Sequence, residues 1–293
     1  MLYIYKYYIF KYYIFINMIY IIHDDCTQNK LKFMYDPFVK TSFKYIKDTY
    51  DDECIFLHNN YNIDLMNKGD KLILIGNMKS FDLEFLKKKG IYTILYWTEP
   101  KIVTSYTNEV WLYSKNLFNN FKKINLNQKI KFIPIICQVG VPKINYKLNN
   151  KFKLLFIGNL KVRPKNIRRS LNKLSYFKEL TNLWNDDDYN NIITSNSNIF
   201  YSCNKITSLN VLPSCRINKL LSHGCIVISQ LCNETDMKLY KGLVYFCDFD
   251  KISNLFKSFL RKSKDELSIL SNDIYRNFEN KFYTRYKNLV CER

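Results

Sequence analysis

The sequence predicts an α/β fold of two doubly wound domains that face each other across a cleft. Short apolar, β-rich runs alternate with longer amphipathic stretches from Met18 onward, which is typical of βαβ units and a mostly parallel sheet. The alternation restarts after the Asn-rich residues 142–150. A chain of 293 residues with 47% hydrophobic and 24% charged residues can bury two cores, which excludes a disordered protein.

Residues 1–17 precede the first predicted strand, and we interpret them as an N-terminal extension. Lys6 and Lys11 interrupt their apolar run, and the uncharged stretch 12–22 is shorter than the roughly 20 residues of a membrane-spanning helix. No small-residue cleavage site follows an apolar core, as a signal peptide requires. The alternative is an interfacial anchor, which would give weak contact with a membrane surface.

Six apolar runs predict the strands of a first Rossmann-like domain, residues 18–141. These strands are expected at 19–22, 54–58, 71–75, 92–96, 110–113 and 131–136. Amphipathic stretches between them predict helices over 37–49, 81–89 and 115–122. Ser80 and Ser114 stand where the second and third of these helices would have their caps.

Residues 142–150 carry Pro and Asn but little apolar periodicity, so they are expected to be a linker. A second Rossmann-like domain is predicted over residues 151–270. Its strands are expected at 152–157, 192–194, 198–201, 225–229 and 243–246, and its helices at 166–174, 215–222, 251–261 and from 264 onward. A C-terminal helix over residues 271–293 is expected to cross back over the first domain.

The net charge of +19 suggests nucleic acid as a partner, because clustered Lys and Arg release phosphate counterions. The composition weakens that inference. The chain has no alanine, and its 45 basic residues are 37 Lys and 8 Arg, as an AT-rich parasitic or viral genome would supply. The basic residues are dispersed, and no RNA-recognition or zinc-finger motif is present, so no specific nucleic-acid partner is predicted.

The cysteines predict a reducing compartment. There are nine, an odd number, and none belongs to a C-x-x-C pair or another zinc-ligand spacing. A cytoplasmic location is therefore expected, which would be the host cytoplasm for a viral protein.

In a doubly wound domain, ligands bind at the carboxyl ends of the strands. Gly158, Asn159, Arg163 and Lys165 follow the first strand of the second domain and lead into a helix. Helix N-terminal amides attract anions, so Arg163 and Lys165 are candidate contacts for a diphosphate. The alternative is an ordinary turn with solvated basic side chains.

The segment LPSCRINKLLSHGCIVISQ, residues 212–230, contains Arg216, Leu221 and Gly224 at spacings that resemble the donor-site segment of GT-B glycosyltransferases of the "glycosyl transferases group 1" type. The later segments NETDMKLYKGLVYFCDFDKISNLFKSFL and FENKFYTRYKNLV are also similar to that family. The resemblance covers roughly residues 152–289. It implies transfer of a sugar from a nucleotide-sugar donor to a hydroxyl acceptor, with Arg216 at the diphosphate.

The family helix carries an acidic residue that binds the nucleotide ribose, and Lys219 stands at that position. A lysine only donates hydrogen bonds and cannot accept one from a ribose hydroxyl. Lys219 therefore contacts phosphate instead, or donor binding is altered, or the protein has lost activity. For Arg216 the alternative is a plain salt-bridging residue of the helix.

Two acidic residues of the first domain are candidate catalytic groups. Asp24 follows the strand that ends near His23, and Glu99 follows the strand that ends near Trp97. A carboxylate at the edge of the cleft could deprotonate an acceptor hydroxyl. We assign Asp24 as the base and Glu99 to positioning. The alternatives are an acidic turn at Asp24 and a turn that Pro100 terminates at Glu99.

Two acidic clusters could imitate the D-x-D of a metal-dependent transferase. Asp250 is expected to cap a helix, and Asp186–Asp188 are expected in a solvated loop, so metal independence is predicted. The predicted function is a hexosyltransferase-like glycosyltransferase with no cofactor, a nucleotide-sugar donor, and a glycan, protein or lipid acceptor. The alternatives are a non-catalytic sugar-nucleotide binder with a degenerate site and a basic nucleic-acid-binding protein.

Overall fold

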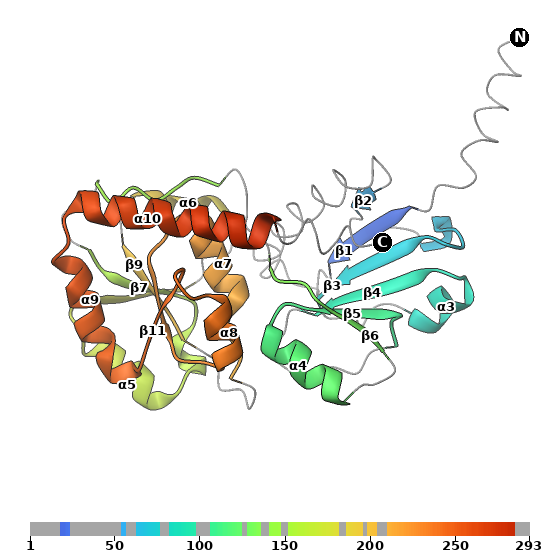
Figure 1. The fold of residues 1–293 in the computed structure, drawn as a ribbon, viewed down its shortest axis with the longest axis horizontal. Coiled ribbons are helices and arrows are strands. Elements are labelled where there is room, and N and C mark those ends of the chain that lie inside the picture. Colours follow the sequence, from blue (N-terminus) through green and yellow to red (C-terminus); the bar gives the residue numbers. More distant parts are fainter. Residues whose placement is uncertain are drawn as a thin grey trace, which may run out of the picture.

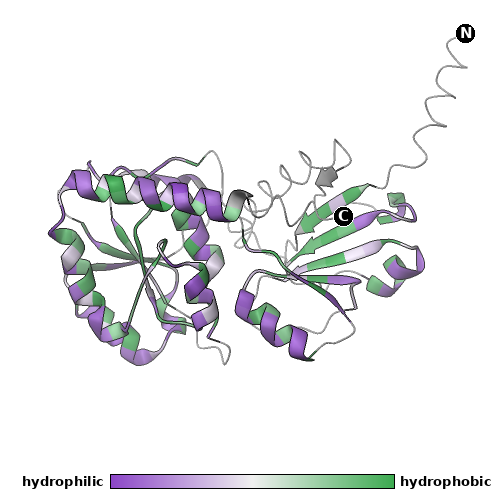
Figure 2. Cartoon of the chain, viewed as in Figure 1, coloured by the Kyte–Doolittle hydropathy of each residue, from purple (hydrophilic) through white to green (hydrophobic). Residues whose placement is uncertain are grey.

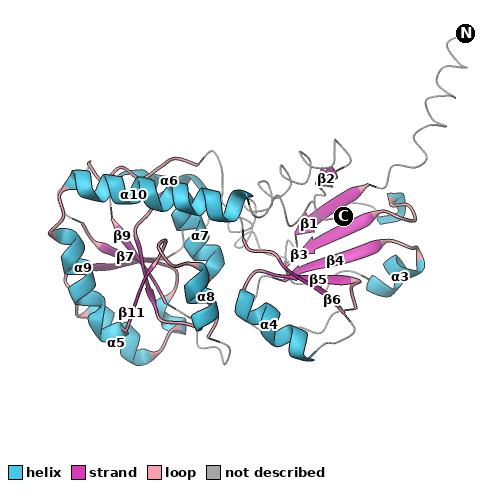
Figure 3. Ribbon diagram, in the orientation of Figure 1, coloured by secondary structure: helices cyan, strands magenta, loops and turns pink. Residues whose placement is uncertain are grey.

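The computed structural model describes residues 18–23, 54–56, 63–76, 82–97, 106–124, 128–135, 141–147, 152–181, 186–195, 198–203 and 210–284. Within these ranges the chain forms two parallel β-sheets, each packed against helices (Figure 1, Figure 3). This confirms the prediction of two α/β units. In the described part of the chain, no helix is both long enough and apolar enough to span a membrane.

The first sheet has six parallel strands in the order β2-β1-β3-β4-β5-β6. The strands are β1 (Ile19–His23), β2 (Cys54–Phe56), β3 (Lys71–Ile75), β4 (Tyr92–Trp97), β5 (Glu109–Leu112) and β6 (Lys129–Phe132). Their apolar sequences suit a parallel sheet, in which both faces of a strand are buried. All six lie within two residues of where the sequence predicts a strand to begin.

Alternate residues of β1 and β3 pack into cores on opposite faces of the sheet. One core contains Ile21 and Ile73 together with Leu117 of α4 (Lys115–Ile124), and the other contains Leu72 together with Leu86 of α3 (Leu83–Lys88). The alternation follows from the two-residue period of a strand. Figure 2 shows the resulting hydrophobic strands, with green over most of β3 and over the isoleucines of β1.

Side-chain caps fix where these two helices begin. The hydroxyl of Ser114 accepts a hydrogen bond from the backbone N–H of Leu117 at 3.1 Å, which confirms Ser114 as the cap of α4. For α3 the cap is Asp82, whose carboxylate accepts from the N–H of Phe85 at 2.9 Å, rather than the predicted Ser80. The predicted helix 37–49 lies outside the described residues.

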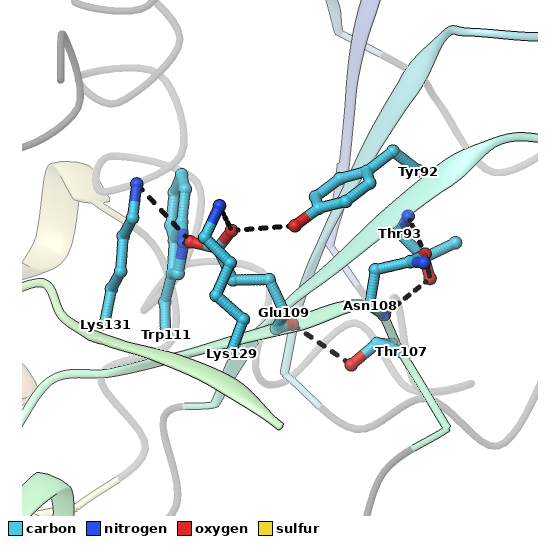
Figure 4. Close-up of polar contacts among 8 residues, drawn as sticks. All are labelled: Tyr92, Thr93, Thr107, Asn108, Glu109, Trp111, Lys129 and Lys131. Atoms are coloured by element: carbon cyan, nitrogen blue, oxygen red, sulfur yellow. Dashed lines mark hydrogen bonds and ion pairs between the residues drawn. The ribbon is translucent and has the colours of Figure 1, made fainter. Parts of the chain in front are cut away.

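A buried charge network joins the amino ends of three strands (Figure 4). The Glu109 carboxylate, 2% exposed, accepts hydrogen bonds from the Tyr92 hydroxyl at 3.0 Å and from the Trp111 ring N–H at 2.7 Å. The ammonium groups of Lys129 and Lys131 lie 3.1 and 3.6 Å from the same carboxylate. Every oxygen of Glu109 is therefore partnered, at the edge of the sheet opposite the carboxyl ends of the strands.

The second sheet has five parallel strands in the order β11-β10-β9-β7-β8. The strands are β7 (Leu154–Ile157), β8 (Phe177–Leu180), β9 (Ile199–Ser202), β10 (Val227–Gln230) and β11 (Tyr245–Cys247). The helices of this half are α5 (Lys165–Asn172), α6 (Asp186–Ser195), α7 (Ser214–Ser222), α8 (Glu234–Leu239), α9 (Ile252–Leu260) and α10 (Lys264–Phe278). Its short helical turns are η3 (Leu160–Val162), η4 (Phe249–Lys251) and η5 (Glu279–Thr284), while the turn η2 (Ile63–Leu65) belongs to the first half of the chain.

Three local predictions in this half were wrong. Residues 192–194, predicted as a strand, form the last turn of α6, and Asp186–Asp188, predicted in a loop, begin that helix. Asp250 lies inside η4 and caps no helix, because α9 begins after Lys251. The strand β8 and the helix α8 were not predicted, since neither shows a clear apolar period.

Residues 141–147, at the predicted linker, pack against the second domain. Ile144 and Tyr146 are buried in its core, and the Tyr146 hydroxyl donates to the carbonyl of Asn198. Lys147 pairs with Asp265 at the start of α10 at 2.8 Å. This segment is thus held in place by apolar burial and by hydrogen bonds.

Candidate functional site

The site lies at the carboxyl ends of two neighbouring strands in the second sheet. The chain leaves β7 toward β8 on one side and then returns to form β9 on the other side of β7. The direction of winding therefore reverses between β7 and β9. In open parallel sheets, ligands bind at such a point because the loops after the two strands diverge there. Gly158 follows β7 and Cys203 follows β9.

Two arginine side chains meet over one aromatic ring at this point. The guanidinium carbon of Arg216, on α7, lies 5.1 Å from the centre of the Phe156 ring. That of Arg163, between η3 and α5, lies 5.8 Å from the same ring centre. The ring faces attract cations, and Tyr201 of β9 packs beside Phe156 with its ring centre 6.4 Å away. The fold thus gathers two positive charges at one place.

The positive charges of these arginines are not paired with acidic side chains. Nη1 of Arg216 and Nε of Arg163 are buried and have no hydrogen-bond partner, and no ion pair between described residues includes either arginine. Burial, together with the positive charge of Arg163, lowers the pKa of Arg216 to about 10. Buried donors without partners are rare and costly, so the arrangement is suited to an anion with several oxygen acceptors.

Gly158 makes room for the Arg216 side chain. Its φ of +139° is one that side chains rarely adopt. A Cβ at this position would lie 3.1 Å from Nη2 of Arg216 and 3.3 Å from the Phe156 ring. A Cβ at this position would therefore crowd the guanidinium group and the ring, and its backbone conformation would be strained.

Two helices begin at the site without a side-chain cap. Pro164 precedes α5 and Pro213 precedes α7, and neither helix has a capping hydrogen bond from a side chain. The first amides of a helix carry partial positive charge and bind anions when no side chain occupies them. In α7 the N–H groups of Ser214 and Arg216 already donate to the carbonyls of Leu212 and Pro213, so it is the start of α5 that adds to the charge of the two arginines.

Of the residues predicted to bind substrate, Gly158, Arg163 and Arg216 come together. Asn159 is exposed, and its side chain accepts from the N–H of Lys161 at 2.8 Å, which caps η3. Lys165 is an exposed side chain in the first turn of α5. Lys219 is 5% exposed, and its ammonium group lies 4.2 Å from the centre of the Tyr189 ring.

Three further residues contribute to this site and were not predicted from the sequence. Phe156 supplies the ring under both arginines, and Tyr201 has a buried hydroxyl without a hydrogen-bond partner. Burial raises the pKa of the Cys203 thiol, and the charges of Arg163 and Arg216 oppose that rise. Cys203 could have been found from its place directly after a strand. Phe156 and Tyr201 could not have been found in this way, because both lie inside apolar strands, where aromatic residues are typical of the core.

The predicted catalytic residues Asp24 and Glu99 lie outside the described residues. The strands that precede them, β1 and β4, are both paired with β3, and their carboxyl ends share one edge of the first sheet. Among the described residues, no three His, Cys, Asp or Glu side chains gather as a metal ion would require. The predicted roles of Asp24 and Glu99 and metal independence stay predictions.

No protein-family model and no curated protein matches the sequence. Solved structures are similar in fold. T4 phage BGT in complex with UDP-glucose has a TM-score of 0.58 at 10% identity, covering 94% of this chain and 100% of that one. The E. coli trehalose-6-phosphate protein bound with UDP-2-fluoro glucose has a TM-score of 0.54 at 8% identity, covering 91% and 86%.

A third similar structure is the Glycosylation Associate Protein (Gap123) complex from Streptococcus agalactiae, with a TM-score of 0.50 at 7% identity. The match covers 77% of this chain and spans 55% of the length of that one. At these identities the likeness shows the fold alone. The chain therefore shares the two-domain α/β fold of these proteins.

Proposed function

We propose that the protein is a glycosyltransferase of the GT-B type that transfers a sugar from a nucleotide-sugar to a hydroxyl acceptor without a metal ion. The observation that carries the proposal is the pair of arginines beside the Phe156 ring, Arg163 and Arg216, each with a buried guanidinium nitrogen that has no hydrogen-bond partner. The likeness in fold to structures that hold UDP-glucose and UDP-2-fluoro glucose supports it. We assign the donor diphosphate to these two arginines.

The arrangement is suited to the departure of a nucleoside diphosphate. When the bond between the sugar and the diphosphate breaks, negative charge develops on the phosphate oxygens. Donors that are already in place stabilise this charge without reorganising, which is worth several kcal/mol in a water-poor site. Arg163, Arg216 and the uncapped start of α5 would supply these donors.

The first experiment measures nucleotide binding by calorimetry, after thermal-shift screening with UDP, GDP and their sugars. We expect Arg216→Ala to weaken binding by about 1.5–3 kcal/mol, or roughly 10- to 150-fold, because a charge-assisted hydrogen bond is lost. Arg261→Ala, which removes an exposed arginine at the end of α9, is the matched control and should bind as the wild type does. Unchanged affinity in a folded Arg216→Ala variant would remove Arg216 from the site.

For catalysis we propose Asp24 as the base that takes the proton of the acceptor hydroxyl, with Glu99 positioning a substrate. Asp24→Asn keeps the shape of the side chain but removes its basicity. Turnover should therefore fall about 10²-fold or more, with donor affinity preserved. The two roles would be exchanged if Asp24→Asn kept its turnover and Glu99→Gln lost it. Full turnover in both variants would show that neither carboxylate is the base.

A non-catalytic sugar-nucleotide binder is the second candidate, because Lys219 stands where the similar family has its ribose-binding acid. Calorimetry together with a donor-hydrolysis assay separates the two candidates. The glycosyltransferase should bind a nucleotide-sugar and hydrolyse it slowly when no acceptor is present. Tight binding with no hydrolysis, and no transfer to any acceptor, would favour the binder.

A further inference from the structure

A single carboxylate from the second domain caps a helix of the first domain. Asp236 lies on α8, is 1% exposed, and belongs to the second half of the chain. Its two oxygens lie 3.0 and 2.9 Å from the hydroxyl of Ser114, which donates to them. The backbone N–H of Asn116 donates to the same carboxylate at 3.3 Å. The start of α4 is therefore held from across the domain boundary.

The same carboxylate also holds the segment that leads into α7. The backbone N–H of Leu212 donates to Oδ2 of Asp236 at 3.3 Å. Leu212 is followed by Pro213 and then by α7, whose third residue is Arg216. Asp236 thus touches the start of α4 in one domain and, in the other, the backbone four residues before the arginine of the anion site.

Apolar packing and a further hydrogen bond between the two domains reinforce the contact made by Asp236. Val211, next to Leu212, is 3% exposed and packs in the core of the first domain. The side-chain amide of Asn218, on α7, donates to the carbonyl of Ile135 at 2.7 Å. The start of α7 is therefore embedded in the first domain by apolar packing and by two buried hydrogen-bonding groups.

The chemistry of the contact specifies a carboxylate. Ser114, Asn116 and Leu212 all present donors to Asp236, and no acceptor among the described residues hydrogen-bonds to it. Burial raises the pKa of Asp236, and these hydrogen bonds oppose the rise. An asparagine of the same shape would turn an N–H₂ group toward one of these donors and leave it without an acceptor.

We propose that Asp236 is a positioning residue that couples the first domain to the anion site. By holding the starts of α4 and α7 with one carboxylate, it fixes Arg216 relative to the first domain. A structural change at the start of α4 is then transmitted to the segment before Arg216. In the other direction, an anion bound by Arg216 alters the protection of the α4 amides against hydrogen exchange. Only the effect of a bound anion on α4 rests on the proposed function.

The coupling can be tested without a ligand by hydrogen exchange of backbone amides, read by mass spectrometry. Ser114→Ala removes one hydroxyl of the first domain. We expect exchange to quicken by about fivefold or more in the peptide that contains Leu212, which belongs to the other domain. Glu234→Gln, on the same helix as Asp236 but with its carboxylate exposed and paired to Lys238, is the control and should leave this peptide unchanged.

A second arm compares the wild type with Asp236→Asn, with and without saturating UDP. In the wild type, UDP should slow exchange at the start of α4, and in Asp236→Asn this response should disappear. Unchanged exchange at Leu212 in Ser114→Ala would overturn the proposal. So would an α4 response to UDP that persists in Asp236→Asn. If neither UDP, GDP nor their sugars bind the wild type, the proposed function fails, while the Ser114→Ala arm still decides whether Asp236 couples the domains.

Discussion

At the scale of single residues, the arginine pair is the feature that most constrains function. Two guanidinium groups beside one ring repel each other, and no carboxylate pairs with either among the described residues. Such an arrangement destabilises the free protein, because like charges repel and each arginine has one buried nitrogen without a hydrogen-bond partner. A bound diphosphate would supply those partners, so the cost in the free protein would be offset in the complex.

Lys219 provides a test at the same scale. It is buried over Tyr189 and stands three residues after Arg216, which places the two side chains on one face of α7. A glutamate there could pair with Arg216 and take the place of the anion. We expect Lys219→Glu to weaken UDP binding about tenfold or more, and Lys219→Met, which keeps the packing, to weaken it less.

Calorimetry on both Lys219 variants measures their affinity for UDP and tests this prediction. A large gain in affinity and turnover for Lys219→Glu would mean that the acidic residue of the similar family restores a lost ribose contact. The natural protein would then be an impaired enzyme.

At the scale of elements, the Glu109 network explains how three short strands keep their register (Figure 4). Glu109, Tyr92 and Lys129 are the first residues of β5, β4 and β6, and one carboxylate contacts all three strands. Burial raises the pKa of Glu109. The hydrogen bonds from Trp111 and Lys129, with the charges of Lys131 and Lys129, outweigh burial and hold the pKa below its usual value.

This network should make stability depend on pH. A carboxylate with a lowered pKa stabilises the fold above its usual pKa of about 4.5, and this contribution is lost as the pH falls through the lower value of the folded state. We expect Glu109→Gln to lower the free energy of unfolding by about 1–3 kcal/mol at pH 7. In urea titrations the difference from the wild type should shrink below pH 4.

The control for this prediction is Glu234→Gln, which breaks an exposed pair with Lys238 and should leave the free energy of unfolding nearly unchanged at both pH values. A difference between wild type and Glu109→Gln that stays constant from pH 7 to pH 3 would show that the charge of Glu109 does not stabilise the strands.

At the scale of the whole molecule, a dense group of arginines and lysines surrounds η3 and α5. Six basic residues and no acidic residue lie in residues 160–174, around η3 and α5. They are Lys161, Arg163, Lys165, Arg168, Arg169 and Lys173. Three of the eight arginines of the chain fall within this stretch, and no ion pair between described residues includes any of the six. Lysine drift in an AT-rich gene does not account for this concentration of arginine.

We therefore expect any affinity of the protein for nucleic acid to depend on α5. The double variant Arg168→Glu/Arg169→Glu should bind a DNA oligonucleotide more weakly, with a salt dependence whose slope falls by about 0.9 for each lost phosphate contact. Lys87→Glu/Lys88→Glu, a matched charge reversal on α3, should change neither property. Equal losses in the two double variants would mean that the binding follows net charge alone.

The sequence by itself determined most strands and most helices, because burial on both faces of a parallel sheet forces continuous apolar runs such as Leu154–Ile157 of β7 and Leu72–Ile75 of β3. It also identified Gly224, whose φ of +74° ends α7, and Arg216 through a spacing that resembles a known family. It failed at residues 192–194, where a β-branched run of three is too short to distinguish a strand from the end of a helix.

Only the tertiary structure decided which residues form the site. Strand order brings Gly158 beside Arg216, although 58 positions separate them in the chain, and it places Phe156 under both arginines. The carboxylate of Asp236 meets Ser114 across a separation of 122 residues. Contacts of this kind depend on how sheets and helices pack, and a local pattern of residues carries no information about partners so far away in the chain.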